Sequence, residues 1–151
     1  MSPYDTDLSQ LMYDIGEDVN MVYGCDVSTA YPSDAYNELK YTYGYSAVYN
    51  WQSFNFGTIH SEIQNSRPVL MTGDDSLDPY AVGHMWVTDG SRMTYSCNGD
   101  GTADIYRQLH MNWGWYGSYN GWYNYNNYYI AGTADTVNYN SSNYILTNIH
   151  P

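Results

Sequence analysis

The apolar pattern of this chain changes its period at Pro68. Before that residue, apolar side chains recur every three to four positions, as on one face of a helix, and after it they alternate in short runs between turn residues. Helices followed by strands predict an α+β fold with an antiparallel sheet, rather than alternating βαβ units. We expect helices over residues 5–16, 33–43 and 56–66, and strands over 68–72, 84–88, 93–97, 105–113, 122–130 and 143–149.

Residues 105–113 form the most regular of the predicted strands. Two turns are expected before it, at Asp89-Gly90 and at residues 98–101, because Asp-Gly and Asn-Gly pairs favour tight hairpin turns. Since successive side chains of a strand point to opposite faces, the segment sorts into two sets. Ile105, Arg107, Leu109, Met111 and Trp113 face one way, and Tyr106, Gln108, His110 and Asn112 face the other.

The charge of the chain excludes two classes of partner. Its 151 residues include 16 acidic and only 4 Lys and Arg residues, for a net charge of −12. Nucleic acids and anionic membranes would be repelled by such a chain. The sequence has no apolar run long enough for a membrane helix, and its start does not resemble a signal peptide. With 43% hydrophobic residues, residues 1–151 are expected to fold as a single domain.

The metal-ligating residues do not form a recognisable site. Cys25 and Cys97 are the only cysteines, too few for a disulfide framework, and they lack the spacing of a zinc site. The acidic cluster Asp74, Asp75 and Asp78 lacks the spacing of a calcium loop, so a solvated loop is the expected structure. We therefore predict neither a metal nor a cofactor.

Two segments contain the residues that are candidates for a catalytic site. The first is Gly83-His84-Met85-Trp86-Val87-Thr88-Asp89-Gly90, and the second runs from His110 to Ser118 as His-Met-Asn-Trp-Gly-Trp-Tyr-Gly-Ser. Together they resemble the streptopain family of bacterial cysteine peptidases, whose fold is papain-like. The flanking segments 11–24, 39–45, 63–69 and 143–151 also resemble that family, so the resemblance covers nearly the whole chain and is weakest at residues 91–104.

The resemblance implies a cysteine endopeptidase that cleaves peptide bonds through an acyl-enzyme. In such an enzyme an imidazole draws the proton from the thiol and an amide orients the ring. By resemblance His84 is the general base and acid, Asn112 the orienting group and Trp113 the shield against water. Gly83 and Trp115 are expected to bind substrate, with Trp115 on the primed side. The fold expected is the antiparallel sheet or barrel lobe of the papain-like fold, with a few helices packed on it.

The family pattern places the nucleophilic cysteine far upstream of the histidine, and residues 1–24 contain none. Cys25 falls in a loop of that pattern rather than at the start of its catalytic helix. We therefore expect this chain to correspond to the C-terminal part of such an enzyme. Its partners would be a polypeptide substrate or an upstream half that carries the cysteine. The expected location is secreted or on a bacterial cell surface. An uncovered lobe face would favour dimerisation unless the first helix covers it.

The same residues also permit simpler interpretations. Taken alone, His84 would be a hydrogen-bonded strand histidine, and Asn112 would be a turn residue. The tryptophans would be core aromatics. A second functional hypothesis is a non-catalytic module derived from this fold, in which the aromatic-rich stretch 113–129 binds a peptide or a glycan by stacking.

Overall fold

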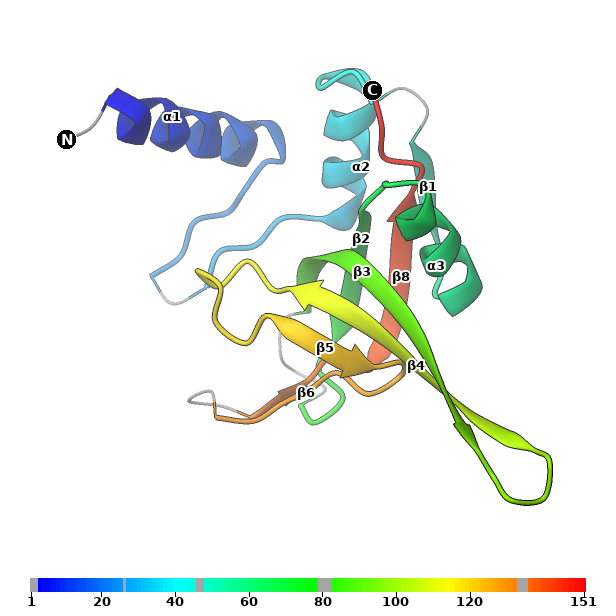
Figure 1. The fold of residues 1–151 in the computed structure, drawn as a ribbon. Coiled ribbons are helices and arrows are strands. Elements are labelled where there is room, and N and C mark those ends of the chain that lie inside the picture. The colour runs from blue at the N-terminus through cyan, green and yellow to red at the C-terminus, as the bar shows by residue number, and fades with distance from the viewer. Residues whose placement is uncertain (1–2, 26, 46–47, 79–82, 133–135) are drawn as a thin grey trace. The chain divides into compact units, whose positions relative to one another are not determined.

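The computed structural model describes residues 3–25, 27–45, 48–78, 83–132 and 136–151. Their contacts group the chain into two units, Met1–Val48 with Pro151, and Tyr49–His150, which are taken one at a time below. The mixed α+β class predicted from the sequence is confirmed, with three helices and an antiparallel six-stranded sheet among the described residues (Figure 1). Within those ranges no helix is both long and apolar enough to cross a bilayer.

The first unit contains two of the three predicted helices. Helix α1 spans Pro3–Asp18 and helix α2 spans Pro32–Tyr41, so both predictions are right to within two residues. Proline is favourable at the first position of α2, because its fixed φ is close to that of a helix. The segment between the helices is held by a bridge between Val22 and Thr29. The Tyr43 hydroxyl donates to Asp18 Oδ2 at 2.6 Å and ties the segment after α2 to the end of α1.

The second unit is built on an open antiparallel sheet in the order β1-β8-β2-β3-β4-β5. Strands β6 and β7 form a separate two-stranded sheet. A strand at 49–53 and another at 137–138 were not predicted, and the segment predicted over 122–130 divides into β5 and β6. The bounds are β1 Tyr49–Ser53, β2 Val69–Asp74, β3 His84–Cys97, β4 Ala103–Asn112, β5 Gly121–Asn124, β6 Tyr129–Ile130, β7 Val137–Asn138 and β8 Ser141–Thr147.

Helix α3, Phe56–Gln64, connects β1 to β2 and packs against the sheet. Asn55 caps it, because its Oδ1 accepts a hydrogen bond from the Thr58 amide at 3.1 Å. The far end is fixed by Glu62, which is buried. Its carboxylate accepts two hydrogen bonds from Arg67 and one from the Asn148 amide, all at 2.8 Å. The helix predicted over 56–66 is thus confirmed, and it ends before Pro68 as expected.

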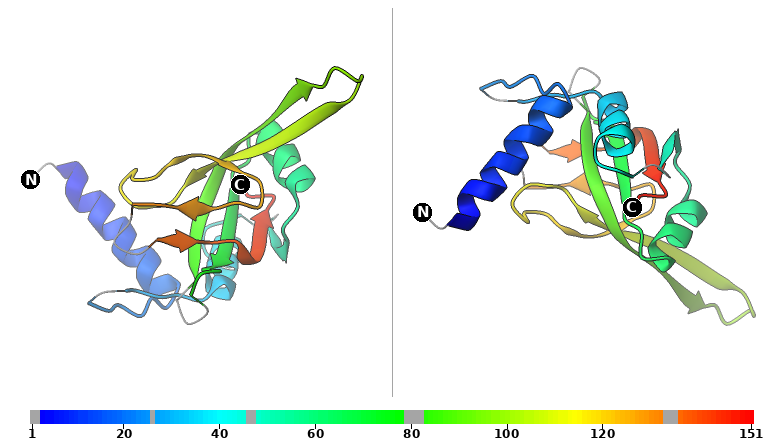
Figure 2. Two further views of the ribbon diagram at one scale, coloured as in Figure 1. Left: turned by 90° about the horizontal axis from the view of Figure 1, so that it is seen from below. Right: turned by 90° about the horizontal axis from the view of Figure 1, so that it is seen from above.

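Strand β3 is far longer than predicted and continues through Asp89-Gly90, where a turn was expected. That expectation is wrong: the register of β3 against β4 shifts between Thr88 and Gly90, which marks a bulge rather than a turn. A Cβ on Gly90 would lie 2.9 Å from the Cβ of His110, so the close approach of the strands requires glycine here. The chain reverses at Asn98–Thr102, as predicted, and Figure 2 shows the distal part of this hairpin extending away from the rest of the sheet.

The core of the second unit lies on one face of the sheet and collects the alternate residues of its strands. Leu109, Met111 and Trp113 are fully buried, which confirms the face assigned to them from the sequence. Ile105 and Arg107 share that face by alternation but lie in the projecting hairpin and are exposed. The other members of the cluster are Phe56, Ile59, Val69, Met71, Trp86, Tyr128, Ile130, Tyr139 and Ile145.

Candidate active site

His84 is the first residue of β3 and lies opposite Gly73 of β2. Alternation along β3 places His84 on the same face as Trp86 and Thr88, both of which are buried. Glycine at position 73 leaves room for this arrangement, because a Cβ there would lie 3.0 Å from the Trp86 ring and 2.9 Å from the Tyr139 carbonyl. The sheet therefore places the half-buried imidazole at the edge of an apolar core.

Aromatic rings surround the imidazole of His84. Its centroid lies 4.9 Å from that of Trp115, 5.4 Å from Tyr139, and 6.2 Å from both Trp86 and Trp113. The Trp113 ring is nearly parallel to the imidazole, at 24°. Trp113 and Trp86 are also buried in the core, as expected if the tryptophans are core aromatics. Rings packed this closely exclude water from one side of the imidazole and strengthen the polar contacts that it makes.

A main-chain oxygen fixes the orientation of the His84 ring. Its Nε2 lies 2.8 Å from the carbonyl oxygen of Trp113. A carbonyl can only accept, so Nε2 carries the proton and donates it to this bond. In the neutral ring the lone pair then belongs to Nδ1, which has no hydrogen-bond partner among the described residues. The ring is held as a base whose free nitrogen is Nδ1.

Burial lowers the pKa of His84 below its ordinary value of 6.5, while the hydrogen bond to the Trp113 carbonyl acts in the opposite direction and is the smaller effect. Desolvation disfavours the charged imidazolium, so the neutral ring predominates at pH 7. A neutral imidazole is the protonation state that can accept a proton from a thiol.

The structure does not bring Asn112 to His84. Asn112 pairs with Val87 across the strands, which places its side chain on the opposite face of the sheet from His84. Its Oδ1 accepts a hydrogen bond from the Gly114 amide at 3.1 Å, the local contact of a turn residue. The expected convergence of carboxamide and imidazole is therefore not found. The Trp113 carbonyl occupies the orienting position at Nε2, and a catalytic role for Asn112 stays a prediction without a contact to support it.

Gly83 and Trp115 flank His84. A Cβ on Gly83 would lie 2.6 Å from Asp74 Oδ1 and 3.2 Å from the Gly73 carbonyl, so only glycine fits without a shift. Trp115 is half-buried, and its outer edge meets the ring of Tyr119 at 85°. Both residues are therefore adjacent to the imidazole, as a substrate-binding role requires, although that role stays a prediction.

Comparison with known proteins bears on this arrangement. Residues 2–123 match the model of the peptidase C10 family. The chain belongs to the peptidase C10 family. Streptopain of Streptococcus pyogenes is 29% identical over 123 residues, which cover 77% of this chain and 27% of the streptopain sequence. Streptopain from the M18 serotype strain MGAS8232 gives the same identity and coverage. The chain thus spans about a quarter of the length of these relatives. No solved structure matches the chain.

A C10 peptidase needs a thiol beside its histidine, and in the unit that holds His84 the described residues include one cysteine, Cys97. Cys25 and Cys97 are both exposed. His84 is the first and Cys97 the last residue of the 14-residue strand β3. At about 3.3 Å per residue, the two are roughly 40 Å apart. Cys25 belongs to the first unit, in the segment between α1 and α2.

Two contributors to the candidate site around His84 were missed by sequence reasoning. One is the Trp113 carbonyl, which leaves no trace in a sequence because every residue has a carbonyl. The other is Tyr139, which packs on His84, Trp86 and Trp113. Its main-chain oxygen accepts a hydrogen bond from Asn143 Nδ2 at 3.0 Å. Tyr139 stands in an irregular polar segment before β8, and no periodicity marks it as a core residue.

The acidic cluster near the candidate site forms more structural contacts than expected. Asp75 is buried rather than solvated, and its Oδ1 accepts hydrogen bonds from the Leu77 and Asn138 amides, each at 2.9 Å. This carboxylate ties the loop after β2 to β7. Within the part of the chain that the structure describes, no three acidic, histidine or cysteine side chains gather as a metal site would require.

Proposed function

We propose that this chain is the histidine-bearing part of a cysteine endopeptidase that hydrolyses peptide bonds. The observation that carries the proposal is the contact between His84 Nε2 and the Trp113 carbonyl, which leaves Nδ1 as the base inside an aromatic enclosure. Membership of the peptidase C10 family supports it. On this proposal the antiparallel sheet of the second unit is the histidine lobe of a papain-like fold.

The proposed mechanism uses the neutral imidazole twice. Nδ1 of His84 takes the proton of a cysteine thiol, which gives a thiolate and an imidazolium. The thiolate attacks the carbonyl carbon of the scissile peptide, and the imidazolium gives its proton to the leaving amine, so that an acyl-enzyme remains. Water then gives a proton to Nδ1 as its oxygen attacks the thioester carbon. The acid is released as the C–S bond breaks, and the imidazolium returns its proton to the departing thiolate. Throughout, the Trp113 carbonyl keeps the ring in the same orientation.

The nucleophile is proposed to come from a segment outside these 151 residues. The position of Cys97 at the far end of β3 supports this, since a thiol there is far beyond the reach of His84. The partners proposed are therefore an upstream segment with the cysteine and a polypeptide substrate. The location proposed is secreted or on a bacterial cell surface, as expected from the family resemblance.

Labelling with an epoxide probe for cysteine peptidases tests the proposal. We expect no labelling of this chain alone. Peptidase activity and labelling should appear when the chain is combined with a streptopain segment that supplies the nucleophilic cysteine. His84→Ala should abolish both. His110→Ala is the matched control, because His110 lies in β4 and pairs with Asp89 at 2.6 Å.

Activity that survives His84→Ala would overturn the role given to His84. Labelling of the chain alone that disappears in Cys25→Ser would instead identify Cys25 as the nucleophile and refute an external source.

A non-catalytic binding module is the second candidate, and Tyr116 is the observation that favours it. This side chain is fully exposed, and its backbone holds a φ of 52°, a conformation that is costly for a bulky residue. The aromatic stretch 113–129 is not one binding surface, however, since Trp113 and Tyr128 are buried. This candidate would be favoured if the chain combined with the streptopain segment shows no peptidase activity but binds a peptide, and if Tyr116→Ala abolishes that binding.

A further inference from the structure

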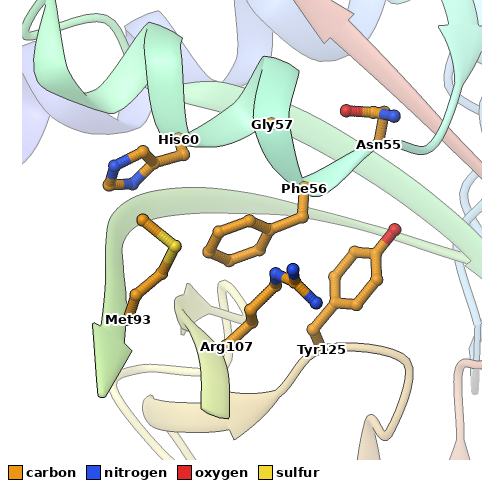
Figure 3. A pocket seen from close by; sticks show the side chains of 7 residues that line it. All are labelled: Asn55, Phe56, Gly57, His60, Met93, Arg107 and Tyr125. Carbon is orange, nitrogen blue, oxygen red and sulfur yellow. The ribbon is translucent and has the colours of Figure 1, made fainter. Parts of the chain in front are cut away.

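A cavity lies in the second unit, between the start of α3 and the β3–β4 hairpin. It has a volume of about 400 Å³ and lies outside the His84 site. Figure 3 shows the side chains of His60, Phe56, Met93, Arg107 and Tyr125 around one space. Asn55 and Gly57 complete the lining. A space of this size accommodates a small ligand or a few side chains of a peptide.

The walls of the cavity are aromatic and packed in place. Phe56 is buried and stacks on His60 at 5.7 Å, nearly parallel, and meets Tyr125 edge-on at 5.4 Å. Phe54 stacks behind Tyr125 at 4.9 Å. His60 is anchored by a hydrogen bond between its Nδ1 and Ser91 Oγ, 2.9 Å apart. Walls held in this way lose little freedom when a ligand binds.

Arg107 is the charged group of the cavity, and its guanidinium differs from the other three cationic side chains of the protein. Lys40 donates to the Tyr36 hydroxyl, Arg67 pairs with Glu62, and Arg92 donates to Gln108. The Arg107 guanidinium makes no hydrogen bond or ion pair with any described residue, and it lies 5.9 Å from the Phe56 ring centroid. Its cross-strand neighbour on β3 is Met93, which is uncharged.

The charge balance makes this arrangement unusual. The chain has four acidic residues for every Lys or Arg, yet the described structure places no carboxylate on this guanidinium. Arg107 is exposed, and a planar guanidinium whose donors no described residue occupies can bind a carboxylate through two parallel hydrogen bonds. One cation in a strongly acidic protein suits a singly charged anion better than a multiply charged one.

We propose that this cavity binds a carboxylate that is flanked by an aromatic or aliphatic group, the chemistry of an acidic or chain-terminal peptide segment. The carboxylate pairs with Arg107, and the apolar group packs between Phe56, Met93 and Tyr125. The proposal is independent of the peptidase proposal, because the cavity uses none of the residues around His84.

Binding of N-acetylphenylalanine, followed by NMR on the intact chain, tests the proposal. N-acetylphenylalanine amide is the matched probe, because it keeps the ring and lacks the charge. We expect the acid to bind at least about tenfold more tightly than the amide. N-acetyl-Asp-Phe-amide distinguishes the source, since it offers a side-chain carboxylate in place of a chain terminus.

Two arginine variants distinguish a direct contact with Arg107 from the effect of the protein's overall charge. Arg107→Gln should remove the preference for the acid, whereas Arg92→Gln makes the same charge change on the same hairpin and should alter affinity less than twofold. Met93→Trp should fill the cavity and weaken both probes. Melting curves confirm that each variant folds. Equal affinity for acid and amide, an unchanged preference in Arg107→Gln, or an equal loss in Arg92→Gln would overturn the proposal.

Discussion

The chemistry of His84 depends on its surroundings more than on its identity. The other histidines of the chain are His60, His110 and His150. His60 is bonded to Ser91 and His110 to Asp89, both through Nδ1. At His84 it is Nε2 that is engaged, by a carbonyl that can only accept. The contacts within the second unit therefore hold His84 in the tautomer that the proposed mechanism needs.

A titration of the histidine ring protons by NMR checks this description. We expect the pKa of His84 to lie below 6.5, because burial disfavours the imidazolium. A neighbouring thiolate would favour the imidazolium, so the pKa should rise when a cysteine-bearing segment is added. His84→Gln assigns the resonance. A pKa above 6.5 in the chain alone would contradict the burial that the structure shows.

The same shift makes folding stability depend on pH. Since the folded pKa of His84 lies below the unfolded value, its contribution is complete above the unfolded pKa near 6.5 and declines as pH falls toward the folded pKa. In His84→Gln, denaturant titrations should show a smaller loss of stability between pH 7 and pH 5.

At the scale of elements, sequence reasoning found what periodicity encodes. The three helices and the buried face of β4 follow from apolar spacing. Strand β1 was missed because its burial pattern does not alternate. Asp89-Gly90 was predicted as a turn because the same dipeptide occurs in turns and in bulges. Only the register of β3 against β4 and the close approach of His110 identify it as a bulge. Asn112 was misplaced relative to His84 because the family motif gives an order of residues but not a register.

The bulge provides a test at this scale. Gly90→Ala should lower the free energy of unfolding by about 1–3 kcal/mol, because the new Cβ would lie 2.9 Å from the Cβ of His110 and force the strands apart. Gly99→Ala is the control, since a Cβ at that position of the hairpin turn meets nothing within 4 Å. Urea unfolding measures both variants, and equal losses would mean that the two strands do not approach closely at Gly90.

At the scale of the whole molecule, charge is the dominant property. The net charge of −12 is opposed by few ion pairs. Among the described residues Arg67 pairs with Glu62, whereas His110 and Asp89 share a hydrogen bond. We therefore expect the repulsion among the acidic groups to destabilise the fold more than the attraction within the ion pairs stabilises it.

Thermal unfolding at different salt concentrations tests this balance at neutral pH. The unfolding midpoint should rise from low ionic strength to physiological ionic strength, because salt screens the repulsion among carboxylates. Potassium chloride should act like sodium chloride if screening is the cause. A midpoint that falls with added salt would show that the ion pairs dominate.

The bond from His84 to the peptide oxygen of Trp113 has a consequence for genetics. That oxygen is present whatever side chain a codon specifies at position 113, so no single amino-acid replacement deletes it. If the proposed peptidase function holds, a saturation screen for loss of proteolysis would identify the His84 imidazole and would miss its orienting partner. Under the proposed function, the orienting partner of His84 would then be absent from any map of essential residues, although every variant retains it.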